Sequence, residues 1–262
     1  MTARTTDFLA WSAEQHAECE IETHTQTKNL DPRFAEFRSK TACLLNLLFD
    51  FATCAWGCAG KGHLVEAITG KCVSSARAAI TLIDFGHYDE ALALVRSIAE
   101  VANLFCFFID DPDQYRSWLK SSREERLRKF SPVKIRVAIE KRGLPIPYGE
   151  KRYRILSEAG THANPEVRPQ AHNSQELQTL GGLFQERGYV RCVTELAFSM
   201  AIVGATSVVI ANLQNNRALI KEKAFALWQA VEESGLEPSL KGYEDKTNSL
   251  QTLIGSVRAW KR

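Results

Sequence analysis

LAFSMAIVGATSVVIANL, residues 196–213, is the stretch that decides the fold of this 262-residue chain. Its 18 residues carry no charge and lie between Glu195 and Arg217. That length is at the lower limit for a membrane span, and several serine, threonine, glycine and asparagine residues dilute its hydrophobicity. Because the neighbouring periodic segments are amphipathic and need a central partner, we expect a helix buried in the middle of a bundle. A membrane span is the alternative.

The composition is that of a globular protein with a full core, since 45% of the residues are hydrophobic and 24% are charged. The 15 glycines and 8 prolines are too few for a turn-rich all-β protein. A net charge of +2 is too balanced to indicate nucleic-acid binding by itself.

Apolar residues at helical spacing predict a series of helices and no strand. Proline and glycine signals mark most of their ends. The expected helices cover residues 32–56, 64–85, 89–109, 113–130, 132–142, 150–161 and 174–187, then 189–233 as one helix or two, and a last helix that ends at Trp260. The fold class is therefore all-α, a helical bundle with a central apolar helix. We expect residues 1–30 to form an acidic helical appendage and residues 31–262 to form one domain.

The first 22 residues lack a basic start followed by an apolar run, so we expect no signal peptide. Seven cysteines are an odd number, and most lie in apolar helical stretches, which is typical of reduced thiols in a core. These observations predict a cytoplasmic, bacterial-type protein that does not enter a membrane.

A polar row lies between two apolar stripes in the segment 89–109. Arg96, Glu100 and Asn103 form this row, at helical spacing. If the helix is central, these groups are partly buried and must be paired. One interpretation is a structural ion pair between Arg96 and Glu100. The other is a polar pocket that these residues line.

A second polar face lies in the segment 150–161. Tyr153 and Ser157 share this face, and His162 follows at the expected end of the helix. A histidine there is stabilised by the helix dipole when protonated, and its charge changes near neutral pH. The candidate pocket therefore comprises Arg96, Glu100, Asn103, Tyr153 and Ser157. His162 is a candidate site residue, and a capping histidine is the alternative.

A resemblance rests on the octapeptide 93–100, ALVRSIAE, together with the later pattern Tyr153-x3-Ser157-x4-His162. Over residues 64–213 the chain resembles bacterial helical proteins of unknown function, some of which are similar to the HEPN superfamily. HEPN proteins are helical bundles, and many are RNases of toxin–antitoxin and phage-defence systems. The resemblance implies a bundle of this kind and an RNA partner.

The catalytic pattern of HEPN RNases is an arginine, four to six residues, and then a histidine. Here Arg154 and His162 are separated by seven residues, and Arg168 and His172 by three, with Pro169 between them. The resemblance implies His162 as the acid or base and Arg154 on the phosphate. The departure in spacing argues against cleavage.

Basic residues cluster between positions 120 and 154, a stretch that contains twelve lysines and arginines but only four acidic residues. Such a cluster is typical of a surface that binds nucleic acid, and also of a solvated face or a dock for an acidic partner. The candidate nucleic-acid-binding residues are Arg123, Arg126, Arg128, Lys129, Lys134 and Arg136.

Metal and cofactor motifs are weak. Cys54, Cys58, His63 and Cys72 are suitable zinc ligands, but their spacing lacks the two matched halves of common zinc sites. Neither nucleotide-binding loops nor a nucleophile elbow occur. We therefore assign no metal and no cofactor from the sequence, and the four residues remain an open alternative.

Three functions fit these observations. The first is a noncatalytic helical interaction module, of a defence or toxin–antitoxin system, with a protein partner. The second is an HEPN-like protein that binds or cleaves RNA, or meets another phosphate-bearing partner, through its basic face. The third is a binder of a small ligand in the polar row. We favour the first because the catalytic spacing fails, and we expect a homo-oligomer.

Overall fold

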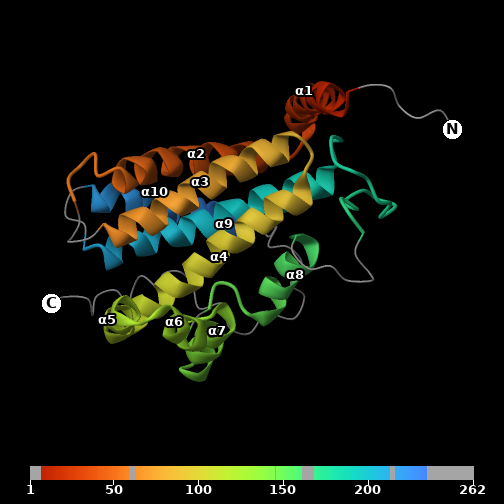
Figure 1. Cartoon of the computed structure of the whole chain (residues 1–262). Helices are drawn as coiled ribbons and strands as arrows, with labels where there is room; N and C mark the ends of the chain where they lie inside the picture. The colour runs from red at the N-terminus through yellow and green to blue at the C-terminus, as the bar shows by residue number, and fades with distance from the viewer. Residues whose placement is uncertain (1–6, 59–62, 145, 161–167, 213–215, 235–262) are drawn as a thin grey trace.

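Helix α9, Glu186–Ile210, runs through the middle of a helical bundle in the computed structural model of the chain (Figure 1). The structure describes residues 7–58, 63–144, 146–160, 168–212 and 216–234. These residues form α-helices and one short 3-10 helix, and no strand lies among them. The prediction of an all-α bundle with a central apolar helix is confirmed.

Every residue of α9 from Cys192 to Ile210 is buried. Its hydroxyl groups are satisfied within the helix, as when Thr206 donates to the carbonyl of Ile202 at 2.7 Å. A β-carbon at Gly204 would lie 3.1 Å from a Leu44 methyl group, so glycine permits the close approach of α2. The serine, threonine and glycine residues that dilute the hydrophobicity of this segment therefore do not require solvent.

Two helices, α4 and α9, are long and apolar enough to cross a membrane. In α9 the whole apolar window is buried by the other helices, and in α4 about 61% of it is buried. A fully covered core helix has this composition without any membrane. The cytoplasmic location of the chain stays a prediction.

Four helices pack on α9 and supply most of the core. Asp31 caps the first of them by accepting the backbone N–H of Arg33, with proline at the first helical position. The turn between the next two is closed by Gly86, whose φ of +71° suits glycine. These helices are α2 (Pro32–Ala52), α3 (Leu64–Asp84), α4 (Tyr88–Asp110) and α10 (Arg217–Glu233).

The remaining helices lie around this bundle. Helix α1 contacts the end of α3, and α5, α6 and α7 follow the far end of α4, so α1 and the α5–α7 segment lie at opposite ends of the molecule (Figure 1). These outer helices are α1 (Phe8–Gln26), the 3-10 helix Thr27–Asn29, α5 (Pro112–Lys120), α6 (Arg123–Lys129), α7 (Pro132–Lys141) and α8 (Glu150–Gly160).

Two helix predictions are wrong. The segment 113–130 is two helices, because Ser122 begins α6 with a capping box that it forms with Glu125. The segment 174–187 is irregular as far as Gln185, because the Asn173 side chain accepts the backbone N–H groups of residues 175 and 177. The segment 189–233 resolves into α9 and α10, and the expected last helix lies outside the described residues.

A buried ion pair joins α8 to the central helix. The Arg152 guanidinium donates to the Glu195 carboxylate at 3.0 and 3.1 Å, and both side chains are almost fully buried. The guanidinium also stacks 3.9 Å from the ring centre of Phe198. The Tyr148 hydroxyl donates to Glu195 at 3.3 Å, and burial together with this carboxylate raises the pKa of Tyr148. Arg152 of α8 thus neutralises the buried Glu195 carboxylate of α9.

We predict that Arg152→Met lowers the free energy of unfolding by about 3–5 kcal/mol, because it leaves the Glu195 charge buried without its partner. Adding Glu195→Leu should recover much of that loss, because no buried charge remains. The measurement is equilibrium unfolding in urea.

Arg154→Met is the matched control, since Arg154 is exposed and pairs with Glu158 at 3.6 Å one turn along the same helix. It should cost less than about 1 kcal/mol. Equal losses for Arg152→Met and Arg154→Met would contradict the role of the buried pair.

Candidate functional site

The polar row on α4 meets α8 through a single tyrosine hydroxyl. Arg96 donates to the Tyr153 hydroxyl at 2.6 Å, and that hydroxyl donates to Glu100 at 2.6 Å. Arg96 and Glu100 also form a direct ion pair at 3.3 Å. The Arg96 side chain is 21% exposed and the Glu100 side chain is 33% exposed, so the contact is half-buried. We call this contact of Arg96, Glu100 and Tyr153 the α4–α8 seam. The structure thus brings together three residues of the predicted pocket.

A second arginine closes the seam. Arg136, on α7, lies with its guanidinium 4.2 Å from the ring centre of Tyr153, and Arg96 lies 4.9 Å from the same centre. Arg136 is only 7% exposed, so its assignment to an exposed nucleic-acid-binding surface is wrong. One of its terminal nitrogens makes no hydrogen bond to another described residue. Stacking on the ring replaces part of the solvation that the guanidinium loses.

The other two residues of the predicted pocket have local roles. The Asn103 amide donates to the backbone carbonyl of Tyr148 at 2.9 Å and accepts its N–H at 3.1 Å. It therefore fixes the segment that leads into α8. The Ser157 hydroxyl donates to the carbonyl of Tyr153 within α8 at 2.8 Å. These contacts use the polar groups of both residues to position the backbone.

The predicted catalytic pair is not assembled by the described residues. Arg154 points into solvent and pairs with Glu158. His162 lies outside the described residues. The seam and the exposed Arg154 side chain belong to different faces of α8, since Tyr153 is buried and Arg154 is exposed.

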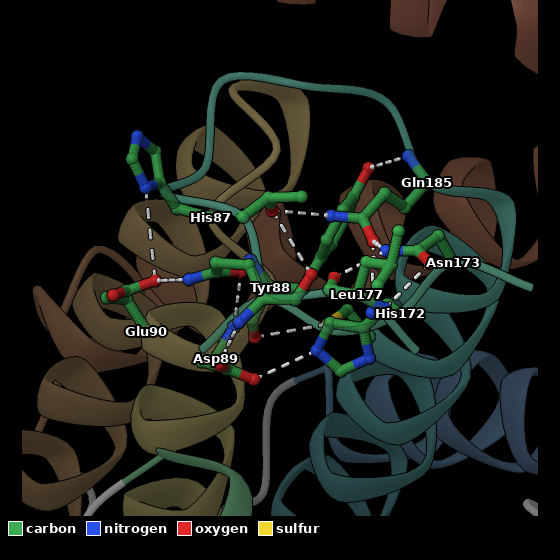
Figure 2. A network of polar contacts seen from close by, with 11 residues as sticks. His87, Tyr88, Asp89, Glu90, His172, Asn173, Leu177 and Gln185 are labelled. Atoms are coloured by element: carbon green, nitrogen blue, oxygen red, sulfur yellow. Dashed lines mark hydrogen bonds and ion pairs between the residues drawn. The ribbon is translucent and has the colours of Figure 1, made fainter. Parts of the chain in front are cut away.

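A larger polar network, which the sequence did not reveal, holds residues 168–185 against the start of α4 (Figure 2). The Gln170 side chain accepts the backbone N–H groups of Tyr88 and Asp89, so it caps α4 from a distant segment. Asp89 in turn accepts the backbone N–H of Gln170 at 2.7 Å. His172 lies 2.9 Å from the other Asp89 oxygen.

The same network continues to the start of α9. The Tyr88 hydroxyl accepts the backbone N–H of Gln185 at 3.0 Å, and the Gln185 side chain accepts the N–H of His172 at 3.0 Å (Figure 2). A histidine that is hydrogen-bonded to an aspartate can transfer protons in an active site. Here the His172 and Asp89 side chains keep only 11% and 17% of their exposure, and their other bonds hold backbone. The pair therefore positions residues 168–185.

The α5–α7 arm, residues 112–141, differs from the seam and the His172 network because most of its charged side chains are exposed. Its basic side chains at Arg123, Arg126, Arg128, Lys129 and Lys134 are exposed, and none of them forms an ion pair in the part of the chain that the structure describes. Leu127 and Val133 are exposed among them, at 66% and 53%. The arm thus presents positive charge mixed with aliphatic side chains.

Comparison with known proteins adds one finding. The model of a family of unknown function (DUF5677) matches residues 67–134, about a quarter of the chain. The matched residues run from α3 to the start of α7, and they include Arg96, Glu100 and the basic residues of α6. No curated protein and no solved structure matches the chain. The similarity to related proteins of unknown function agrees with the sequence prediction.

We predict that Tyr153→Phe lowers the free energy of unfolding by about 1–2 kcal/mol, because the hydroxyl that joins Arg96 to Glu100 is lost from a half-buried site. Urea unfolding measures this loss. Tyr115→Phe is the control, because the half-buried Tyr115 hydroxyl has no hydrogen bond to another described residue. A Tyr153→Phe loss no greater than the control would mean that the seam is open to solvent.

Proposed function

We propose that this chain is a noncatalytic helical interaction module that docks a partner through the α5–α7 arm. One observation carries the proposal. The seam on α4 is filled by the protein's own arginine, glutamate and tyrosine side chains, whereas the charged and apolar groups of the arm are exposed.

The state of the seam supports a structural role for it. A substrate would need the Arg96 guanidinium or the Glu100 carboxylate, and both already bind the Tyr153 hydroxyl. Arg136 covers the tyrosine ring from α7. A ligand that entered here would have to replace these contacts, which is unfavourable for groups that are partly desolvated.

The composition of the arm supports a protein as its partner. Contiguous patches of exposed apolar side chains mark protein interfaces, and arginine is enriched in such interfaces. Nonspecific RNA-binding surfaces add exposed aromatic rings on which bases stack. The large exposed apolar side chains of the arm are aliphatic, namely Leu119, Leu127, Val133 and Val137.

The partner that fits this surface has acidic and apolar groups on one helix, and a second copy of the chain presents such a helix. In α1 the exposed Glu14, Glu18 and Glu22 accompany Ile21, which is 68% exposed. Because α1 and the arm lie at opposite ends of the molecule (Figure 1), a two-fold pair can match both surfaces at once. The resemblance to HEPN proteins favours a toxin–antitoxin or defence system as the setting.

We predict that the protein self-associates at low salt, and that Arg126→Glu with Lys129→Glu weakens the association at least about tenfold, because like charges then face each other. Reversing Glu14 and Glu18 to lysine in the same chain should restore it. Sedimentation velocity over a concentration series, at two salt concentrations, measures the dissociation constant.

The matched control is Lys71→Glu with Arg77→Glu, which makes the same change in charge at exposed positions of α3. It should leave the association unchanged. A monomer at all concentrations, or a control that weakens association as much as the arm variant, would contradict the proposal.

RNA binding is the second candidate, because the five exposed basic residues of the arm lack ion pairs among the described residues. Binding through phosphates would fall steeply as salt rises and would show little sequence preference. A gel-shift titration with single-stranded RNA separates the two candidates. RNA binding that Arg126→Glu with Lys129→Glu abolishes, in a protein that stays monomeric, would favour the RNA-binding function.

A further inference from the structure

The turn between α2 and α3 brings two cysteines and a histidine to one point on the surface. The Cys54 sulfur lies 3.2 Å from Nδ1 of His63. The ligand atoms of Cys54, Cys58 and His63 all lie within 4.8 Å of one another. In a tetrahedral zinc site with ordinary bond lengths, neighbouring sulfur and nitrogen ligands are about 3.5–3.8 Å apart. The three side chains therefore need only small adjustments to share one ion.

The backbone is bent to make this cluster. Cys54 has a φ of +56° and His63 a φ of +50°, both in the left-handed region that residues other than glycine rarely occupy. His63 occupies the position before α3, yet its side chain makes no capping hydrogen bond and lies against Cys54 instead. Left-handed residues of this kind concentrate at ligand sites, where a further interaction offsets the strain.

The charges near the cluster favour a cation. Partial burial, the neighbouring Cys58 and the Glu66 carboxylate all raise the pKa of Cys54. Cys58 and Glu66 thus oppose the ionisation of Cys54. A bound divalent ion reverses this effect, because coordination removes the thiol protons. Cys58 and His63 are exposed, so an ion can reach them from solvent.

Cys72, the fourth residue of the sequence pattern, takes no part. It is 2% exposed inside α3, and burial raises its pKa to about 12. The remaining ligand set has two sulfur atoms and one imidazole nitrogen. Such soft and borderline ligands suit Zn²⁺ and do not suit Mg²⁺ or Ca²⁺, which require oxygen.

We propose that Cys54, Cys58 and His63 bind one Zn²⁺ ion, with water as the fourth ligand. Two thiolates and a neutral imidazole balance the charge of the ion. The ion links the end of α2 to the first residue before α3, and it thereby restrains the connection between two helices that pack on α9. This site shares no residue with the α5–α7 arm.

Titration of the reduced full-length chain with Co²⁺ tests the proposal, because tetrahedral Co²⁺ with thiolate ligands has strong visible and near-ultraviolet absorption. We expect saturation at one equivalent and displacement by Zn²⁺. Cys58→Ser and His63→Ala should abolish the thiolate-dependent spectrum or weaken binding more than tenfold. Cys43→Ser is the matched control, since Cys43 is an exposed cysteine on α2, and it should bind Co²⁺ as the wild type does.

Thermal unfolding supplies a second readout. One equivalent of Zn²⁺ should raise the Tm of the wild type and of Cys43→Ser, and leave that of Cys58→Ser unchanged. Cys58 and His63 are exposed, so their variants should fold, and circular dichroism checks this. Co²⁺ spectra without a thiolate band, an unchanged spectrum in Cys58→Ser, or saturation at half an equivalent would each overturn the proposal.

Discussion

The structure depends on one constraint, which is that α9 has no face toward solvent from Cys192 to Ile210. Every polar group on this part of the helix must therefore find a partner within the protein. The hydroxyl groups use carbonyls of the same helix, but the Glu195 carboxylate needs a cation from outside. Arg152 supplies it and so brings α8 onto the bundle. Once α8 is there, its next residue, Tyr153, meets Arg96 and Glu100 on α4. The buried charge of α9 thus determines where the polar seam forms.

The polar groups of the protein divide into those that are hydrogen-bonded within the fold and those that are exposed to a partner. In the seam and around His172, hydrogen bonds join helices or hold backbone, and the side chains are largely covered. Two exposed surfaces lie at opposite ends of the molecule (Figure 1). Positive charge and aliphatic side chains are exposed on the α5–α7 arm, and negative charge is exposed on α1. This division is the observation on which the proposed interaction module rests.

Features that depend on local spacing were predictable from the sequence. The uncharged run identifies α9, and the spacing of Arg96 and Glu100 predicts their pairing. Features that depend on tertiary packing were not. Arg136 and Arg152 belong to a basic run, and only the helices that cover them make them buried. Asn173 turns an expected helix into an irregular segment through its own side chain. Cys54 and His63 meet because of left-handed backbone that periodicity does not reveal.

Hydrogen–deuterium exchange at a low and a high protein concentration tests the central claim most directly, because it reports covered backbone along the whole chain. The account predicts that residues 192–210 exchange slowest at both concentrations. Residues 8–22 and 123–137 should gain protection only at the high concentration. Protection gained instead by residues 96–103 and 150–157, or by no segment, would contradict the division between a structural seam and a docking arm.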